Sequence, residues 1–208
     1  MRIVCISDTH NRTSNLEIPD GDVLIHAGDF CGSGNWYEIA RFKSFLADLP
    51  HKHKIIIAGN HDWPLVDKSD PYTQALIKEF TYLEDSGCTI GGFNFWGSPW
   101  QPEFYNWAFN LPRGAAIREK WRLIPENTDV LITHGPPFGI LDSVPGGLKV
   151  GCEDLATEVL QRVKPKVHVF GHIHHSYGHT IKDNTIFVNA STCTEQYEPF
   201  NPPIVIDL

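Results

Sequence analysis

The chain has 208 residues, of which 41% are hydrophobic, so it is long enough to bury a substantial core. A formal charge of −8 excludes a broad basic surface for nucleic acid, because proteins that follow the phosphate backbone carry an excess of lysine and arginine. The sequence contains no run of about 18 apolar residues, so it predicts no membrane-spanning helix.

The N-terminal segment meets polar residues at once and lacks the apolar stretch of a secretion signal, so we expect a cytoplasmic protein. Its five cysteines are scattered and show no CxxC spacing, which is typical of reduced thiols rather than of disulfides or a structural zinc site. No repeat, linker or low-complexity tract divides the chain, and residues 1–208 are predicted to form one domain.

Short apolar runs rich in β-branched residues alternate with helical patterns along the chain. Strands buried on both faces are predicted at 3–7, 23–27, 54–58, 129–133 and 167–171. A helix is predicted at 35–50, where the pattern stops at a proline, and another at 152–165, which opens with acidic residues and closes with basic ones. This alternation indicates an α/β architecture.

Two further segments depart from this alternation. Residues 88–99 resemble a hairpin that turns at two glycines, and residues 188–208 are typical of strands joined by a proline-rich loop. Together they favour a second, largely antiparallel sheet. The aromatic segment 93–113 either covers one end of the core or forms a wall that stacks a nucleobase. Arg113, at the end of this segment, could reach a phosphate group.

Side chains that bind metal or transfer protons follow five of the predicted strands. They are Asp8, His10, Asp29, Asn60, His61, His134, His172 and His174. Because ligands gather beyond the carboxyl ends of strands in open α/β sheets, we expect these side chains to meet. Oxygen and imidazole groups without thiolate suit manganese, iron, zinc or nickel. There are more of them than one ion needs, which predicts two ions that share a carboxylate and a water.

Each motif taken alone also fits an ordinary turn. Asp8 in DTH could cap a helix, and GNHD could be a tight turn, because glycine and asparagine tolerate left-handed backbone. A lone His134 is more often a core or surface residue than a ligand. Five such motifs at five strand ends are much harder to explain as separate turns.

Taken in order, the motifs DTH, GD, GNHD, THGPP and GHIH resemble those of the calcineurin-like metallophosphoesterase superfamily. The segments THGPPFGILDSVP and RVKPKVHVFGHIH resemble the metallophosphoesterase domain-containing (Mpped) group within it, and the similarity covers essentially the whole chain. The resemblance implies an α/β fold in four layers, an αββα sandwich of two mixed β-sheets flanked by helices.

The resemblance also implies a role for each candidate residue. For two divalent metal ions it implies the ligands Asp8, His10 and His174, then Asn60, His134 and His172, with Asp29 bridging both. His61 matches the non-ligand histidine of the superfamily, which would contact phosphate and protonate the leaving oxygen. Asp62 would either orient His61 or serve as a helix cap or surface residue.

The activity implied is that of a metal-dependent phosphodiesterase, in which a hydroxide bridging the two ions attacks small phosphodiesters, nucleotides and cyclic nucleotides among them. Manganese is the expected ion in vitro, with iron, zinc and nickel as alternatives. A phosphomonoesterase, including a protein phosphatase, would use the same ions, and a nucleotide-binding scaffold of low turnover would keep the same fold. The expected partner is a small phosphoester or nucleotide, not a membrane, and no oligomeric state is predicted.

Overall fold

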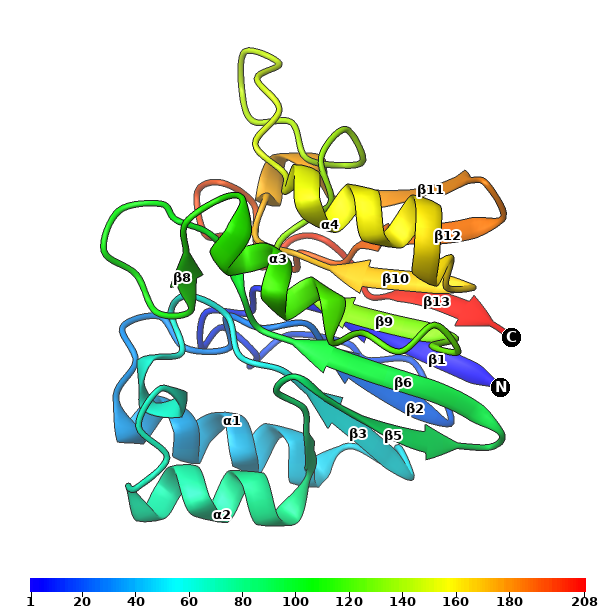
Figure 1. Ribbon diagram of the computed structural model, residues 1–208. Coiled ribbons are helices and arrows are strands. Elements are labelled where there is room, and N and C mark those ends of the chain that lie inside the picture. The colour runs from blue at the N-terminus through cyan, green and yellow to red at the C-terminus, as the bar shows by residue number, and fades with distance from the viewer.

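Two β-sheets pack face to face in the computed structural model, which describes residues 1–208, and helices cover the outer face of each sheet (Figure 1). In the first sheet β1 to β4 run parallel, and β13 pairs antiparallel with β1. The strands of this sheet, in spatial order, are β13 (Ile204–Asp207), β1 (Arg2–Ile6), β2 (Val23–His26), β3 (His53–Ile56) and β4 (Thr81–Tyr82). The three strands predicted in the N-terminal part are therefore confirmed.

The second sheet contains the predicted hairpin, the two later buried runs and part of the C-terminal segment. Its strands, in spatial order, are β11 (Gly178–Lys182), β12 (Thr185–Asn189), β10 (Val167–Phe170), β9 (Val130–Thr133), β6 (Phe93–Ser98) and β5 (Ser86–Ile90). The expectation of a largely antiparallel sheet is wrong, because β12, β10, β9 and β6 run parallel and only the two edge pairs are antiparallel. Helical crossovers join β6 to β9 and β9 to β10, and such crossovers connect parallel strands.

Four helices form the outer layers, and both predicted helices are confirmed. They are α1 (Trp36–Asp48) and α2 (Pro71–Glu79) on the first sheet, with α3 (Ala115–Arg122) and α4 (Glu153–Thr157) on the second (Figure 1). A π-helical segment, Glu158–Val163, continues α4 and completes the helix predicted over 152–165. α1 begins with a capping box between Asn35 and Glu38, which satisfies free N–H groups at its first turn.

Strand β1 shows why the predicted strands are continuous apolar runs. Ile3 and Cys5 lie in the core between the two sheets, whereas Val4 and Ile6 lie in the core beneath α1 and α2. A strand that is buried on both faces has no solvent-facing position for a polar residue. Beneath α3, the second outer core is built around Trp121, which is fully buried.

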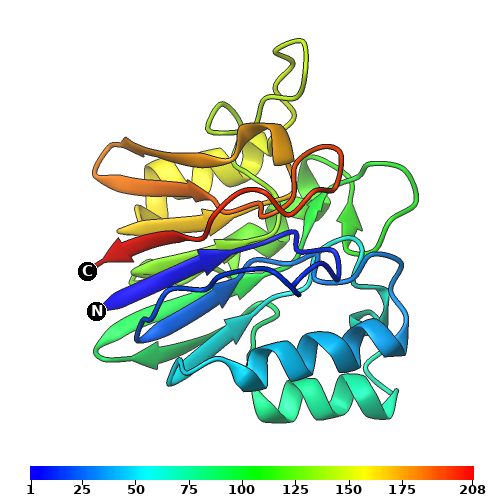
Figure 2. The ribbon, with the colours of Figure 1, turned by 180° about the vertical axis from the view of Figure 1, so that it is seen from behind.

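Both chain termini lie together at one end of the sandwich, where the Met1 amino group donates to the Leu208 carbonyl (Figure 2). The parallel strands of both sheets point away from that end, so their carboxyl ends and the following loops meet at the opposite end (Figures 1 and 2). None of the helices has the length and apolar content that crossing a membrane requires. Because the parallel strands share one direction, the loops after β1, β2, β3, β9 and β10 lie together on one edge of the sandwich.

Gly97 of β6 packs closely against residues of the first sheet. A Cβ atom at this position would lie 2.5 Å from Cβ of Leu83 and 2.7 Å from Cγ2 of Ile57, which belong to the opposite side of the central core. We expect Gly97→Ala to lower the free energy of unfolding by about 1–3 kcal/mol, because the added methyl forces the sheets apart. Urea denaturation measures this change. Thr89→Ala, on the exposed edge strand β5, is the control and should cost no more than about 0.5 kcal/mol.

Candidate metal centre

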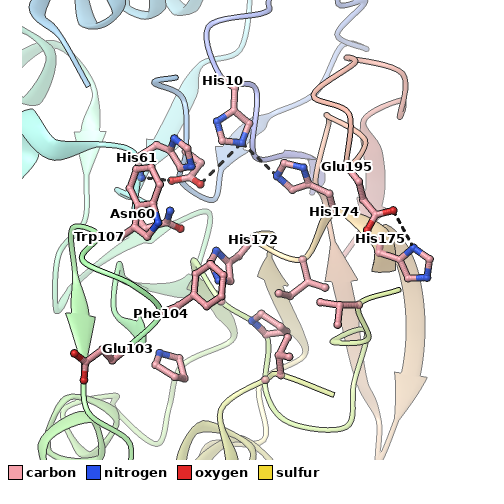
Figure 3. A pocket seen from close by; sticks show the side chains of 18 of the residues that line it. His10, Asn60, His61, Glu103, Phe104, Trp107, His172, His174, His175 and Glu195 are labelled. Atoms are coloured by element: carbon pink, nitrogen blue, oxygen red, sulfur yellow. Dashed lines mark hydrogen bonds and ion pairs between the residues drawn. The ribbon is translucent and has the colours of Figure 1, made fainter. Parts of the chain in front are cut away.

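All eight side chains singled out in the sequence meet at the loop edge of the sandwich. They follow β1, β2 and β3 of the first sheet and β9 and β10 of the second, so both sheets contribute. Figure 3 shows His10, Asn60, His61, His172 and His174 turned toward a common centre. The candidate ligand atoms of the seven histidines and aspartates fall into three overlapping groups, each within 4.8 Å: Asp8, His10 and His174; His10, Asp29 and His61; and Asp29, His134 and His172.

The first group places two imidazole nitrogens against each other. Nε2 of His10 lies 3.2 Å from Nε2 of His174, which lies 3.3 Å from a carboxylate oxygen of Asp8. Nδ1 of each ring faces a backbone carbonyl, that of Cys31 or Thr194, and a carbonyl only accepts. Both rings therefore carry their proton on Nδ1 when neutral, and their Nε2 lone pairs converge on the carboxylate. A cation placed between these acceptors would be bound by all of them.

The third group repeats this arrangement around His134. Its Nδ1 faces the Ala27 carbonyl at 2.9 Å, and its Nε2 lies 3.0 Å from Oδ1 of Asn60 and 3.3 Å from Oδ2 of Asp29. The same Asp29 oxygen lies 4.0 Å from Nε2 of His10, so this carboxylate belongs to both halves of the cluster. That shared position is what a bridging ligand requires.

Burial and the neighbouring charges set the protonation of these groups. Burial lowers the pKa of His10 and of His172 to about 4, so both imidazoles are neutral at pH 7 and able to bind metal. Burial also acts to lower the pKa of His134, but the Asp29 carboxylate outweighs it and raises that pKa to about 9. For Asp29 itself, burial opposes ionisation, yet His134 holds its pKa below the ordinary range. A metal ion on His134 would displace this proton.

The backbone at four of these residues is in the left-handed region. The φ angles are 50° at Asp8, 43° at His10, 58° at Asp29 and 67° at His172. Residues other than glycine adopt this conformation at a cost, and such strain gathers at functional sites. Turning the chain this sharply after each strand directs the side chain back toward the other sheet.

Residues that sequence reasoning missed hold the Asp8 carboxylate in place. It accepts the N–H of His172 at 3.0 and 3.1 Å and the hydroxyl of Ser191 at 2.9 Å, which also donates to Asn189. A Cβ atom on Gly171 would lie 2.0 Å from the same carboxylate. The only sequence signal for Ser191 was the polar segment that follows β12, the last strand of the parallel set.

Asp62 neither orients the His61 side chain nor lies on the surface. It is fully buried, and its oxygens accept the N–H groups of Asp29, Cys31 and Gly59 at 2.7 to 2.9 Å. Its carboxylate therefore ties the turn after β2 to the turn after β3. His61 is held differently, since its backbone N–H donates to Asp29 at 2.7 Å and its Nδ1 lies 2.7 Å from the Gly32 carbonyl.

The cluster forms the floor of a pocket of about 390 Å³. Phe104 and Trp107 form one wall, and His175 and Glu195 line the opposite side (Figure 3). Tyr197 also lines the pocket, with its ring edge to face with those of His10 and His174. The aromatic segment 93–113 contributes both to the core and to the pocket, and stacking on a nucleobase stays a prediction. Part of it packs in the core with Phe95 and Phe109, and part of it lines the pocket.

Two buried histidines stand behind the ligands, one in each sheet. His26 Nε2 lies 2.9 Å from the hydroxyl of Thr9, and His168 Nε2 lies 2.8 Å from the hydroxyl of Thr133. Each threonine is the neighbour of a candidate ligand in sequence. Both rings are fully buried, so they support the candidate ligands from inside the strands.

These two histidines should make the protein sensitive to acid. Burial lowers the pKa of each to about 3, against about 6.5 in the unfolded chain, so between these values the unfolded state binds more protons. Stability is complete above about pH 6.5 and falls as the pH drops, by up to ~2.7 kcal/mol per pH unit for the pair. Urea denaturation of chelator-treated protein at pH 7.5 and 5.0 measures this loss. His168→Gln should make the loss smaller, and an unchanged pH dependence would contradict the assignment.

Known proteins are similar to this chain in sequence. A family model described as calcineurin-like phosphoesterase matches residues 1–176. Over 230 residues the chain is 50% identical to metallophosphoesterase domain-containing protein 1 of Homo sapiens, and this covers 100% of the chain and 71% of the human protein. A UPF0046 protein of Caenorhabditis elegans is 38% identical over 237 residues, covering 100% of the chain and 60% of the nematode protein.

A solved structure described as a novel archaeal phosphodiesterase has a TM-score of 0.52 to this one, at 17% identity, over 100% of this chain and 93% of that chain. At this identity the likeness concerns the fold, and it confirms the predicted arrangement of two mixed sheets between helices. The family uses a dinuclear divalent metal centre, and the three groups of side chains are candidate ligands for one. The chain, as its motifs suggested, belongs to the calcineurin-like phosphoesterase family.

Proposed function

We propose that the protein is a dinuclear metal-dependent phosphodiesterase that hydrolyses small phosphodiesters. One observation carries the proposal: the candidate ligands form the floor of a pocket whose walls offer no free cation. Arg113 is the only lysine or arginine that lines it. Its guanidinium donates to the carbonyls of Val150 and Gly151 at 2.8 and 2.7 Å and pairs with Glu153, so it is already engaged.

The family's two divalent ions fit the residues present, because imidazole nitrogens converge with carboxylate and amide oxygens at the centre of the cluster, and a metal ion would take the place of the proton on His134. Asp8, His10 and His174 would hold one ion, Asn60, His134 and His172 would hold the other, and Asp29 would contact both. When bound, such a pair activates water and neutralises charge on the phosphoryl oxygens. The ligand residues in turn keep a phosphodiester centred above the floor of the pocket.

His61 is proposed to protonate the leaving oxygen. Its Nδ1 proton is held by the Gly32 carbonyl, which leaves Nε2 as the nitrogen that can exchange a proton in the pocket. No interaction within the protein occupies Nε2. A histidine placed in this way acts as a general acid when the departing alkoxide needs a proton.

The charge of the pocket supports a diester as substrate. A phosphomonoester carries one more negative charge than a diester, and the pocket walls present the carboxylates of Glu103 and Glu195 with no free lysine or arginine to balance them. A diester spreads its two substituents to the two sides of the pocket instead. The aromatic faces of Phe104 and Trp107 suit a nucleobase, so nucleotides and cyclic nucleotides are among the substrates we propose.

Replacing the shared carboxylate tests the metal centre. Asp29→Ala should leave the fold intact and lower turnover at least ~10²-fold, because losing one preorganised charge-stabilising group costs ~10²–10³ in rate. The measurement is hydrolysis of a nitrophenyl diester by metal-reconstituted protein, with circular dichroism to check the fold. Asp48→Ala, an exposed carboxylate on α1, is the matched control. Folded Asp29→Ala protein that keeps more than about a tenth of the activity would refute the shared position.

A pair of substrates with the same leaving group tests the preference for diesters. Bis(p-nitrophenyl) phosphate should give a higher kcat/KM than p-nitrophenyl phosphate, because the pocket walls offer no free lysine or arginine for the second charge of the monoester. Reconstitution with manganese, iron, zinc and nickel in turn would identify the ion that supports turnover. The reverse preference would assign the protein to the phosphomonoesterases. No turnover on either substrate, with both ions bound, would favour a nucleotide-binding scaffold.

A further inference from the structure

We propose that Trp107 is a positioning residue, which holds the His61 imidazole in the orientation needed to protonate the leaving group. This inference rests on the proposed function, in which His61 is the general acid. The indole and the imidazole are stacked, with ring centroids 4.3 Å apart and planes inclined by 27° (Figure 3). Trp107 is the only aromatic side chain that meets His61 face to face, since His10 and Tyr197 meet it edge to face.

The stack supplies a restraint that hydrogen bonding alone does not. Nδ1 of His61 donates to the Gly32 carbonyl at 2.7 Å, which fixes one ring atom. One hydrogen bond leaves the imidazole able to rotate about that contact. An indole lying against the face of the ring fixes its plane as well, so the position of Nε2 is determined. Proton transfer depends on this placement, because the donor must lie within hydrogen-bond reach of the oxygen.

The carbonyl that accepts from His61 is itself firmly held. The buried Glu38 carboxylate accepts the N–H groups of Gly32, Ser33, Gly34 and Asn35, at distances between 2.7 and 3.2 Å. This clamp shapes the loop before α1 and fixes the direction of the Gly32 carbonyl. The hydrogen-bond side of the restraint is therefore rigid, and the indole completes it.

The loop that carries Trp107 is anchored to the turn that carries His61. It joins β7 (Gln101–Pro102) to β8 (Asn110–Leu111), and the buried Gln101 amide closes the loop by donating to the Ala108 carbonyl at 2.7 Å. The N–H of Ala108 donates to the Asn60 carbonyl at 3.3 Å. The neighbours of Trp107 and His61 are thus bonded to each other, which fixes how the two rings meet. Trp107 is half-buried, as expected for a side chain that packs against His61 and does not project into solvent.

A direct role in binding substrate is the competing explanation, and a double-mutant cycle separates the two. The variants are Trp107→Leu, Trp107→Phe, His61→Ala and the His61→Ala/Trp107→Leu double variant. Tyr105→Leu is the matched control, since Tyr105 is an aromatic residue of the same loop that is 78% exposed and whose ring meets that of Phe104 and not that of His61. The substrates are methyl aryl phosphates whose leaving groups range from p-nitrophenolate to the more basic phenolate. Melting temperature and bound metal are measured for every variant.

If Trp107 acts through His61, Trp107→Leu should lower kcat on the phenyl diester about 10–10²-fold, the scale of a misplaced catalytic group. The loss should be smaller with p-nitrophenolate, which departs without a proton, and KM should change little. Trp107→Phe keeps an aromatic face and should recover most of the rate, and Tyr105→Leu should match the wild type. In the double variant, removal of Trp107 should slow His61→Ala by no more than about twofold, because coupled residues are not additive.

A readout in metal-free protein tests the stack without turnover. The indole ring current should move the carbon-bound proton resonances of the His61 imidazole upfield in the wild type. That displacement should persist in Trp107→Phe and disappear in Trp107→Leu, with His61→Ala identifying the signals.

Additive losses in the double variant, or equal losses on all leaving groups, would overturn the positioning role and make Trp107 a substrate-binding residue. Unshifted His61 resonances in the wild type would overturn the stack itself. If wild-type protein with both ions bound hydrolyses none of the diesters, the proposed function fails, and the positioning role fails with it. If His61→Ala is slow but Trp107→Leu is not, the positioning inference alone is wrong.

Discussion

Crowding of hydrogen-bond acceptors between the two sheets is the constraint on which the site depends. The Nδ1–H groups of three histidines each donate to a backbone carbonyl, and the Nε2 atoms of these rings face carboxylate and amide oxygens; the three are His10, His134 and His174. Packing acceptors against one another away from water is costly unless a cation lies among them. The fold can accept this arrangement because strong local restraints hold each group, including left-handed turns at Asp8 and Asp29.

Close backbone contact keeps the cluster small enough for a pair of ions. Gly59 lies where a Cβ atom would be 2.3 Å from Oδ1 of Asp29, and Gly171 lies where one would be 2.0 Å from Oδ2 of Asp8. The buried Asp62 carboxylate then ties the turns after β2 and β3 together. Residues outside the set of candidate ligands therefore decide the distances within that set, which explains why polar residues are buried so densely at this edge of the sandwich.

The pocket combines a floor and walls of different origin. The floor comes from turns that directly follow parallel strands, which are rigid because the strands are buried on both faces. The walls come in part from the longer loops that carry Trp107 and Tyr197. In an arrangement of this kind the floor determines the class of reaction, whereas the walls determine which substituents of the phosphoester fit. Arg113 is one of the wall residues that affect which substrates fit. Its guanidinium already contacts backbone carbonyls and Glu153, so it is not free to attract further phosphate groups.

The sequence by itself determined the five buried strands, two of the four helices, the hairpin and the set of side chains at the strand ends. These follow from local patterns: apolar runs, the proline after the first helix, and polar residues where a strand stops. The sequence did not determine that the second sheet is mainly parallel, because β9 and β10 pair with strands that are far away in the chain. Nor did it reveal Ser191 beside Asp8, Asp62 as a backbone clamp, or Trp107 against His61. Each of those contacts joins residues from different loops, so only the packing of the two sheets brings them together.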